Sequence, residues 1–69
     1  MTIILTLNGE QQEFPPNTTV SGLLERLGIA ESKVAVERNL EIVPKSSFSE
    51  TTLAEGDNIE IVHLIGGGK

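Results

Sequence analysis

The chain has 69 residues and a formal net charge of −5, from ten acidic and five basic residues. A chain this short buries only about 60% of the surface that it exposes when unfolded, so we expect one small domain without an enclosed catalytic cleft. The negative charge disfavours nucleic acid and anionic membranes as partners and favours a basic protein surface, and the absence of cysteine excludes disulfides and thiolate chemistry.

Hydropathy along the chain predicts a cytoplasmic protein. No apolar run approaches the length needed to cross a bilayer, and the residues after Met1 have neither a basic start nor a signal-type apolar segment.

The start of the chain predicts a β-hairpin. Residues 2–7 alternate in hydropathy, which predicts a strand with Ile3, Leu5 and Leu7 on one face. Asn8-Gly9 favours a two-residue hairpin turn because both positions tolerate positive φ. Residues 10–14 are therefore predicted to return as a second strand, which Pro15-Pro16 ends.

A single helix is predicted over residues 20–27, because four apolar residues recur there at helical spacing: Val20, Leu23, Leu24 and Leu27. We expect this stripe to pack in the core. The side-chain oxygens of residues 17–19 can cap the helix start, and Gly28 suits a left-handed cap at its end. Gly22 costs about 1 kcal/mol relative to Ala inside a helix, so we expect it to permit close approach to a strand.

The second half of the chain predicts three further strands, over residues 34–38, 42–43 and 59–63. Residues 45–50 are expected to form no more than a turn of helix around Phe48, and Leu53 is expected to reach the core. The order of elements predicts an α+β fold of the ubiquitin-like β-grasp kind, a mixed four- to five-stranded sheet with one main helix on one face. The last strand is expected beside the first, at the centre of the sheet.

The chain ends in three glycines and Lys69. We expect residues 1–65 to form the β-grasp domain and residues 66–69 to be a flexible tail, because consecutive glycines lose the most entropy on ordering. An extended chain from Leu64 to Gly68 reaches about 17 Å at about 3.4 Å per residue. The tail can therefore carry a reactive carboxylate into a narrow site on another protein, although an inert tail is the alternative.

Several segments, in this order, resemble the ThiS family, the sulfur carrier proteins of thiamin biosynthesis. The specific segments are Leu7-Asn8-Gly9-Glu10, Val34-Ala35-Val36-Glu37-Arg38-Asn39, Glu41-Ile42-Val43-Pro44, Gly56-Asp57, and Ile59-Glu60-Ile61-Val62-His63 leading to Gly66-Gly67-Gly68. The resemblance implies that the chain is not an enzyme but a protein-borne sulfur donor on which partner enzymes act.

In that family the carboxylate of the terminal glycine is adenylated with ATP and converted to a thiocarboxylate, which supplies sulfur for the thiazole. The resemblance implies three partners: an E1-like, ThiF-like adenylyltransferase, a ThiG-like thiazole synthase, and a desulfurase or rhodanese that delivers sulfur. It implies no cofactor or metal bound by this chain, since the activating partner uses the ATP.

The resemblance places the reactive end on Gly68 after removal of Lys69, with Gly67 beside it and Gly66 as the hinge. Three glycines leave the choice between Gly67 and Gly68 open. The alternation of the strands also leaves Val62 and Leu64 on the face away from the helix, together with Ile4, and we expect these apolar residues to bind a partner.

Three other functions are compatible with the same residues. The chain could carry sulfur for another pathway, like the small subunit of molybdopterin synthase. It could instead be a ubiquitin-like modifier joined to lysines, or an interaction module. His63 is interpreted as a structural or exposed residue without a catalytic role.

Overall fold

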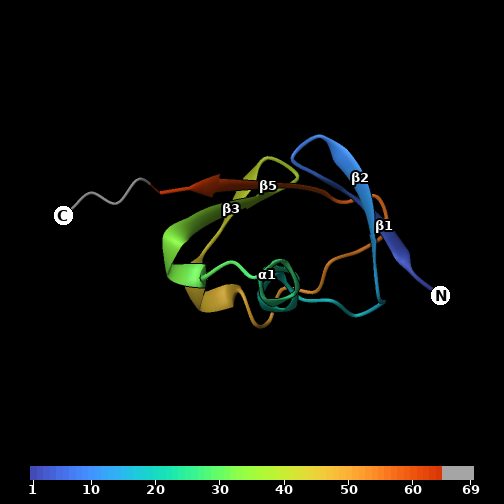
Figure 1. Ribbon diagram of the computed structural model, residues 1–69, viewed down its shortest axis with the longest axis horizontal. Helices are drawn as coiled ribbons and strands as arrows, with labels where there is room; N and C mark the ends of the chain where they lie inside the picture. Colours follow the sequence, from blue (N-terminus) through green and yellow to red (C-terminus); the bar gives the residue numbers. More distant parts are fainter. Residues whose placement is uncertain (65–69) are drawn as a thin grey trace.

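The computed structural model describes residues 1–64 and shows a mixed sheet of five strands with one α-helix on one face (Figure 1). The strands are β1 (Ile3–Leu7), β2 (Glu10–Phe14), β3 (Val34–Arg38), β4 (Glu41–Val43) and β5 (Asn58–His63), and the helix is α1 (Val20–Leu27). Two short 3₁₀ helices, η1 (Glu31–Lys33) and η2 (Lys45–Ser47), complete the elements.

The strand order is β2-β1-β5-β3-β4. β1 and β5 are parallel, and the other neighbouring pairs are antiparallel. The prediction that the last strand lies beside the first is confirmed, and so is the β-grasp fold. β5 lies at the centre of the sheet and ends far from the N-terminus, at the opposite end of the molecule (Figure 1).

The β1–β2 hairpin turns at the residues that the sequence predicted. Asn8 has φ 49° and Gly9 has φ 85°, and positive φ at both central positions defines the turn that matches the twist of a hairpin. The register aligns Ile3 with Phe14 and Leu7 with Glu10. The hairpin therefore points the apolar face of β1 toward the helix.

Helix α1 has the predicted bounds, and both of its ends are capped. The backbone N–H of Gly22 donates to Thr19 Oγ1 at 3.0 Å, and Gly28 adopts the left-handed conformation with φ 73°. The N–H of Ile29 then donates to the Leu24 carbonyl at 2.9 Å, which is the hydrogen bond of a Schellman cap.

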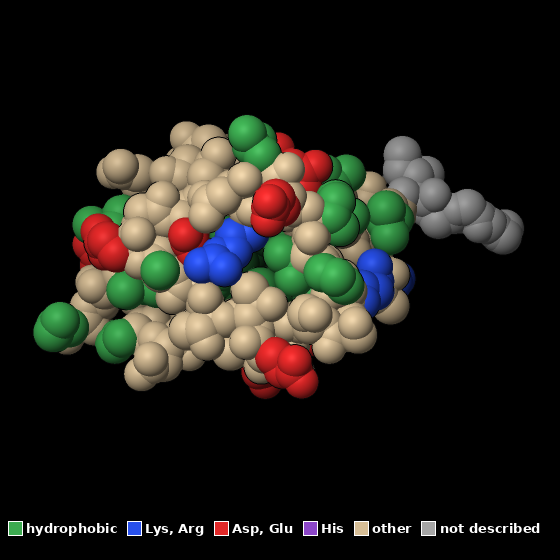
Figure 2. Space-filling model, turned by 180° about the vertical axis from the view of Figure 1, so that it is seen from behind, with side chains coloured by type: hydrophobic (Ala, Val, Ile, Leu, Met, Phe, Trp, Pro, Cys, Tyr) green, Lys and Arg blue, Asp and Glu red, His purple; other side chains and the backbone are tan. Residues whose placement is uncertain are grey.

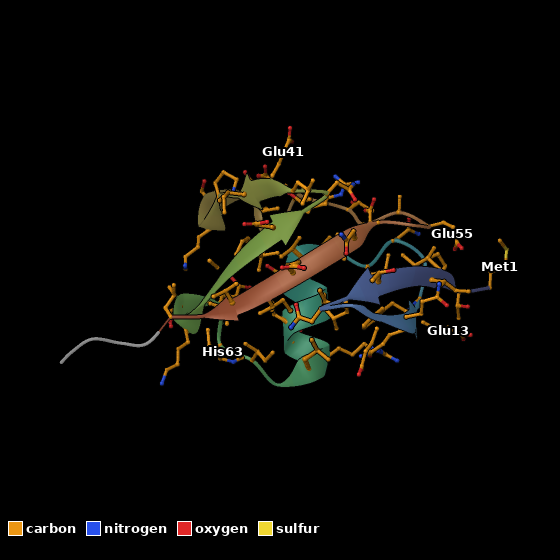
Figure 3. All side chains as sticks on the ribbon, turned by 90° about the horizontal axis from the view of Figure 1, so that it is seen from above. Met1, Glu13, Glu41, Glu55 and His63 are labelled. Carbon is orange, nitrogen blue, oxygen red and sulfur yellow. The ribbon has the colours of Figure 1, made fainter. Side chains whose placement is uncertain are left out.

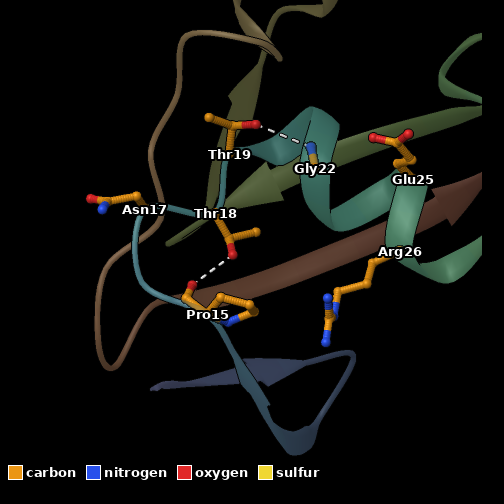
Figure 4. A pocket seen from close by; sticks show the side chains of 7 residues that line it. All are labelled: Pro15, Asn17, Thr18, Thr19, Gly22, Glu25 and Arg26. Atoms are coloured by element: carbon orange, nitrogen blue, oxygen red, sulfur yellow. Dashed lines mark hydrogen bonds between the residues drawn. The ribbon is translucent and has the colours of Figure 1, made fainter. Parts of the chain in front are cut away.

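Two expectations about α1 were wrong. Leu27 is 37% exposed instead of packed in the core, because it is the last residue of the helix and Ile29, just past the cap, packs against the core in its place. Gly22 does not make room for a strand: a Cβ there would meet Thr19 Oγ1 at 3.4 Å and Thr18 Cγ2 at 3.8 Å (Figure 4).

The core lies between the helix and the sheet. Leu53 is buried, as predicted, and Phe48 is buried as well; both close the core from the segment between β4 and β5. The other buried apolar residues come from the strands and α1: Leu5, Leu7, Phe14, Val20, Leu23, Leu24, Val34, Val36, Val43, Ile59 and Ile61. None of the helices within residues 1–64 has the length and apolar character to span a membrane.

Candidate functional site

The central strand β5 carries the chain toward the glycines, and it is held on both sides. On one side it pairs with β3 over five residues, from Arg38↔Ile59 to Val34↔His63. On the other side it pairs with β1 only at Thr6↔Asn58 and Leu7↔Ile59. Residues 65–69 therefore follow a strand whose backbone is anchored almost to its end.

Asn8 extends the short pairing with β1. The N–H of Ile61 donates to Asn8 Oδ1 at 2.8 Å, and Asn8 Nδ2 donates to the Ile61 carbonyl at 3.3 Å. The backbone N–H of Asn8 also donates to the Ile59 carbonyl at 2.9 Å. The side-chain amide thus satisfies the backbone N–H and carbonyl of Ile61, which lie beyond the last backbone pairing of β1 with β5.

The end of β5 is fixed by the segment just before β3. The N–H of Leu64 donates to the Lys33 carbonyl at 2.9 Å, and Lys45 Nζ donates to the Val34 carbonyl at 2.8 Å. His63, across from Val34, is exposed. Two lysines therefore lie beside the last described residues of a chain that is acidic overall.

The sheet face away from α1 exposes apolar side chains near this end. Val62 is 53% exposed and Leu64 is 48% exposed, while Ile42 on β4 is 64% exposed. Figure 3 looks onto this face, with β5 crossing in front of the helix and His63 at one end. In the space-filling view, hydrophobic side chains also gather on the surface near the end of β5 (Figure 2).

Ile4 lies on the same face as Val62 but at its other end. Because Thr6 pairs with Asn58, Ile4 is level with Gly56, six residues before Val62. At about 3.3 Å per residue the two are about 20 Å apart. Figure 3 shows Glu13, the partner of Ile4 on β2, at the end of the sheet opposite His63.

The structure thus brings Val62 and Leu64 together and leaves Ile4 apart from them. The remaining predicted site residues, Gly66, Gly67 and Gly68, lie outside the described residues, as does the boundary predicted between a domain ending at residue 65 and a tail.

A buried carboxylate joins the turn before β5 to the end of β3. Asp57 accepts hydrogen bonds from Arg38 Nε at 2.8 Å, Asn39 Nδ2 at 3.1 Å and the N–H of Ala54 at 2.8 Å. Burial raises the pKa of Asp57, but these hydrogen bonds and the charge of Arg38 together outweigh burial and hold the pKa below its usual range. The cluster fixes the entry of β5 into the sheet, about 20 Å from the strand's other end.

Two surface hollows in the part of the chain that the structure describes are lined by none of the predicted site residues. One lies beside the start of α1 and is lined by residues that include Pro15, Thr18 and Arg26 (Figure 4). Thr18 Oγ1 there donates to the Pro15 carbonyl at 2.6 Å, so its hydroxyl stabilises the loop before α1. Across residues 1–64, no group of three or more His, Cys, Asp or Glu residues is arranged to hold a metal ion.

The sequence pointed to Asn8 and Asp57 only as turn residues. Asn8 contacts a residue 53 positions away and Asp57 contacts one 19 positions away. The one sequence signal for the role of Asn8 was an asparagine in a turn directly after an apolar strand. That signal does not indicate which strand the asparagine contacts.

Comparisons with known proteins agree on one family. The model of the family described as the ThiS family matches residues 5–68, which include the three glycines. A protein named sulfur carrier protein ThiS, from Bacillus subtilis, is 41% identical over 66 residues, which cover 94% of this chain and 100% of that protein.

Two longer relatives carry the name thiazole synthase. The one from Paramagnetospirillum magneticum is 55% identical over 64 residues, covering 93% of this chain and 20% of that protein. The one from Magnetococcus marinus is 49% identical over 63 residues, covering 91% of this chain and 19% of that protein. The chain therefore spans about a fifth of the length of these relatives.

Solved structures agree with the fold. The crystal structure of a thiamine biosynthesis protein (ThiS) from Geobacter metallireducens matches with a TM-score of 0.80 and 33% identity, covering 96% of this chain and 100% of that one. A solution structure of a thiamine biosynthesis protein from the same organism matches with a TM-score of 0.76 and 34% identity, covering 97% of this chain and 90% of that one.

Proposed function

This chain belongs to the ThiS family, and from that premise we infer that it is a protein-borne sulfur donor for thiamin thiazole synthesis, acted on by partner enzymes. The observation that carries the proposal is the family match through residue 68, which includes the glycines, together with a similar protein named as a sulfur carrier that the chain covers in full. The central position of β5 supports the proposal. Because β5 pairs with β1 on one side and with β3 on the other, the point at which the chain leaves the sheet is fixed.

The proposed chemistry begins with the terminal glycine carboxylate, which is a poor electrophile. An oxygen of that carboxylate attacks the α-phosphorus of ATP, pyrophosphate leaves, and an acyl adenylate forms. A sulfur nucleophile then attacks the acyl carbon and AMP leaves. Hydrosulfide gives the thiocarboxylate in that one step, whereas an enzyme persulfide gives an acyl disulfide, which a second thiol cleaves to release the thiocarboxylate and form a disulfide with the donor cysteine. Because the chain has no cysteine, the sulfur is held by the terminus and not by a side chain.

The partners supply the catalytic groups. An E1-like, ThiF-like adenylyltransferase binds the ATP, and a desulfurase or rhodanese delivers the sulfur. A ThiG-like thiazole synthase consumes the thiocarboxylate, and the two thiazole synthases that contain a segment similar to this chain support that association.

The tail residues have distinct roles in this proposal. Gly68 carries the reactive carboxylate once Lys69 is removed, Gly67 threads beside the nucleotide without a side chain, and Gly66 is the hinge. Holding the carboxylate close to the α-phosphate makes the attack effectively intramolecular. Val62 and Leu64 contact the receiving enzyme next to the tail, and a partner that also contacts Ile4 must extend along the sheet for about 20 Å.

Intact mass spectrometry tests the proposal directly. Forms ending at Gly67, Gly68 and Lys69 are incubated with ATP, a ThiF-like enzyme and a sulfur source, and pyrophosphate release is followed in parallel. We expect the Gly68 form to release pyrophosphate and to gain the mass of one sulfur in exchange for one oxygen. One extra residue moves the carboxylate by about 3.5 Å, and a displacement of about 1 Å can slow a reaction about a hundredfold, so the Lys69 form should release little.

Each other outcome has a defined meaning. No mass change in any of the three forms would contradict the sulfur-carrier proposal. Equal release from the Gly68 and Lys69 forms would show that the reactive end is placed wrongly. Covalent attachment of the chain to other proteins, stable under denaturing conditions, would favour a ubiquitin-like modifier.

A further inference from the structure

The end of β5 is bonded to a backbone segment that is itself held from the opposite side. The N–H of Leu64 donates to the Lys33 carbonyl at 2.9 Å, which continues the β3–β5 register one residue past Val34↔His63. Successive residues of a strand direct their backbone groups to opposite neighbours, and the next carbonyl, that of Val34, accepts from Lys45 Nζ at 2.8 Å. Residues 33–34 are therefore bonded on both sides at the point where β5 ends.

Lys45 uses its side chain for this contact because its backbone has left the sheet. The β3–β4 pairing ends at Val36↔Val43, and the same register continued for two residues would place Lys45 opposite Val34. Instead β4 stops at Val43 and η2 begins at Lys45, close to the start of β3 (Figure 1). The ammonium group therefore supplies the donor that a longer β4 would have supplied from its backbone.

The Lys45 contact matters because the carbonyl that it reaches is shielded from water. Val34 is fully buried, with 0% exposure. A hydrogen bond from an ionised donor is stronger than a neutral one, and a buried carbonyl left without a donor is costly. Removal of the ammonium group leaves residues 33–34 without their bond on the β4 side. The Leu64–Lys33 bond should then open more often, because local opening is easiest where few backbone bonds hold a segment.

We propose that Lys45 is a positioning residue for adenylation of the carrier, acting through Val34 and Lys33 on the point at which the chain leaves the sheet. The inference rests on the proposed function, in which the carboxylate of Gly68 reacts. Gly68 follows Leu64 closely in the sequence, so a displacement of Leu64 is passed on to the reacting group. Opening of the Leu64 bond adds one residue, about 3.5 Å, to the chain outside the sheet, and the reaction requires the carboxylate close to the α-phosphate.

Loss of the Lys45 contact should lower kcat and leave KM nearly unchanged. The ammonium group is not among the groups proposed to contact the enzyme, so association is kept. What is lost is the placement of the carboxylate, and an interaction that matters only in the chemical step changes kcat and kcat/KM equally. A charge that steers the two proteins together would instead change KM in a salt-dependent way. A purely structural role would lower the melting temperature and leave kcat unchanged wherever the protein is folded.

The test compares Lys45→Met, which removes the donor, with Lys45→Arg, which keeps the charge and can donate to the same carbonyl. Lys33→Met is the matched control for charge, because it removes a neighbouring exposed ammonium group and keeps the backbone carbonyl that bonds Leu64. Asp57→Asn is the control for stability, because Asp57 lies just before the other end of β5.

All variants are prepared as the form ending at Gly68. Pyrophosphate release with a ThiF-like enzyme gives kcat and KM at low and at physiological salt, and melting temperatures verify that every protein is folded in the assay. Exchange rates of the Leu64 and Ile61 amides are measured on the free proteins, because they report directly on whether the end of β5 stays bonded.

We expect Lys45→Met to lower kcat about tenfold and to keep KM within about twofold. It should speed exchange of the Leu64 amide about tenfold and affect the Ile61 amide less. Lys45→Arg should restore most of both properties, and Lys33→Met and Asp57→Asn should keep kcat within about twofold of the unchanged protein.

An unchanged kcat of Lys45→Met would overturn the inference, and so would an effect on KM alone or unchanged exchange at Leu64. An equal loss of kcat in Lys33→Met or in Asp57→Asn would also overturn it, by reducing the result to charge or to stability. If the unchanged protein released no pyrophosphate, the proposed function would fail together with this role of Lys45. Amide exchange needs no enzyme, so it distinguishes that failure from a failure of Lys45 to hold the end of β5.

Discussion

The side-chain amide of Asn8 bonds to both backbone groups of Ile61, accepting from the N–H at 2.8 Å and donating to the carbonyl at 3.3 Å. The backbone of Asn8 has already left β1 for the hairpin turn, yet its side chain continues the pairing with β5. One residue therefore closes the hairpin and anchors the strand that precedes the tail.

The two roles of Asn8 can be separated by substitution. Asn8→Gly keeps positive φ accessible and removes both side-chain hydrogen bonds, so it should lower the free energy of unfolding by about 1 to 2 kcal/mol. Asn8→Ala removes the same bonds and adds a left-handed strain of about 1 kcal/mol, so it should be the less stable variant. Urea unfolding and the exchange rate of the Ile61 amide provide the measurements. An Asn8→Gly variant as stable as the unchanged protein would show that the amide contributes nothing to β5.

The lowered pKa of Asp57 predicts that the protein loses stability in acid. A group whose pKa is lower in the folded state contributes stability above its unfolded pKa, about 3.9, and loses that contribution as the pH falls through the folded value. The free energy of unfolding should therefore decrease below about pH 4. Asp57→Asn should lower the free energy of unfolding at pH 7 by about 2 kcal/mol, because Arg38 and the Ala54 N–H lose an acceptor. The same variant should lose less stability than the unchanged protein as the pH falls.

Thermal unfolding from pH 2.5 to pH 7 (a range chosen around the pKa values of carboxyl groups, about 4) checks this prediction. Glu50→Gln, at an exposed position, serves as the control and should keep the shape of the unchanged protein's curve. If Asp57→Asn kept the full acid dependence, another carboxylate would have to be its source.

Leu40 occupies an unfavourable backbone conformation, with φ 72° and an 83% exposed side chain. Leu40→Gly relieves a left-handed strain of about 1 to 2 kcal/mol and costs up to about 1 kcal/mol through the more flexible unfolded chain, so it should stabilise the protein by about 0.5 to 1 kcal/mol. Leu40→Ala removes the same side chain but keeps the strain, and its stability should stay within about 0.5 kcal/mol of the unchanged protein. Equal stability of the two variants would show that φ at this position carries no cost.

Val62 and Ile4 are exposed apolar residues at opposite ends of one sheet face. Val62→Asp should slow adenylation by a ThiF-like enzyme about tenfold, because a buried, unpaired charge at a binding surface opposes association. Ile4→Asp places the same charge about 20 Å away and should slow adenylation less. Initial rates of pyrophosphate release compare the two, and melting temperatures verify that both variants fold. The opposite ranking would place the docking surface at the β1–β2 end of the sheet.

The sequence by itself determined the five strands, the α-helix and their order, because the signals for them are local. Alternation defined the faces of β1 and β5, the spacing of Val20, Leu23 and Leu24 defined the buried side of α1, and Asn8-Gly9 and Gly28 defined where the chain turns. Each of these signals acts within a few residues, and the backbone geometry that it requires is the same in any fold.

The tertiary structure alone decided which distant residues meet, because strand register is set by the packing of the whole sheet. Alternation placed Ile4 and Val62 on the same face, but only the parallel pairing of β1 with β5 separated them along it. The opposition of Glu37 and Glu60 and the bonds from Asn8 to Ile61 likewise join segments more than 20 residues apart. Those contacts depend on how the apolar faces of α1 and the sheet pack on each other, and no pattern within a single segment specifies them.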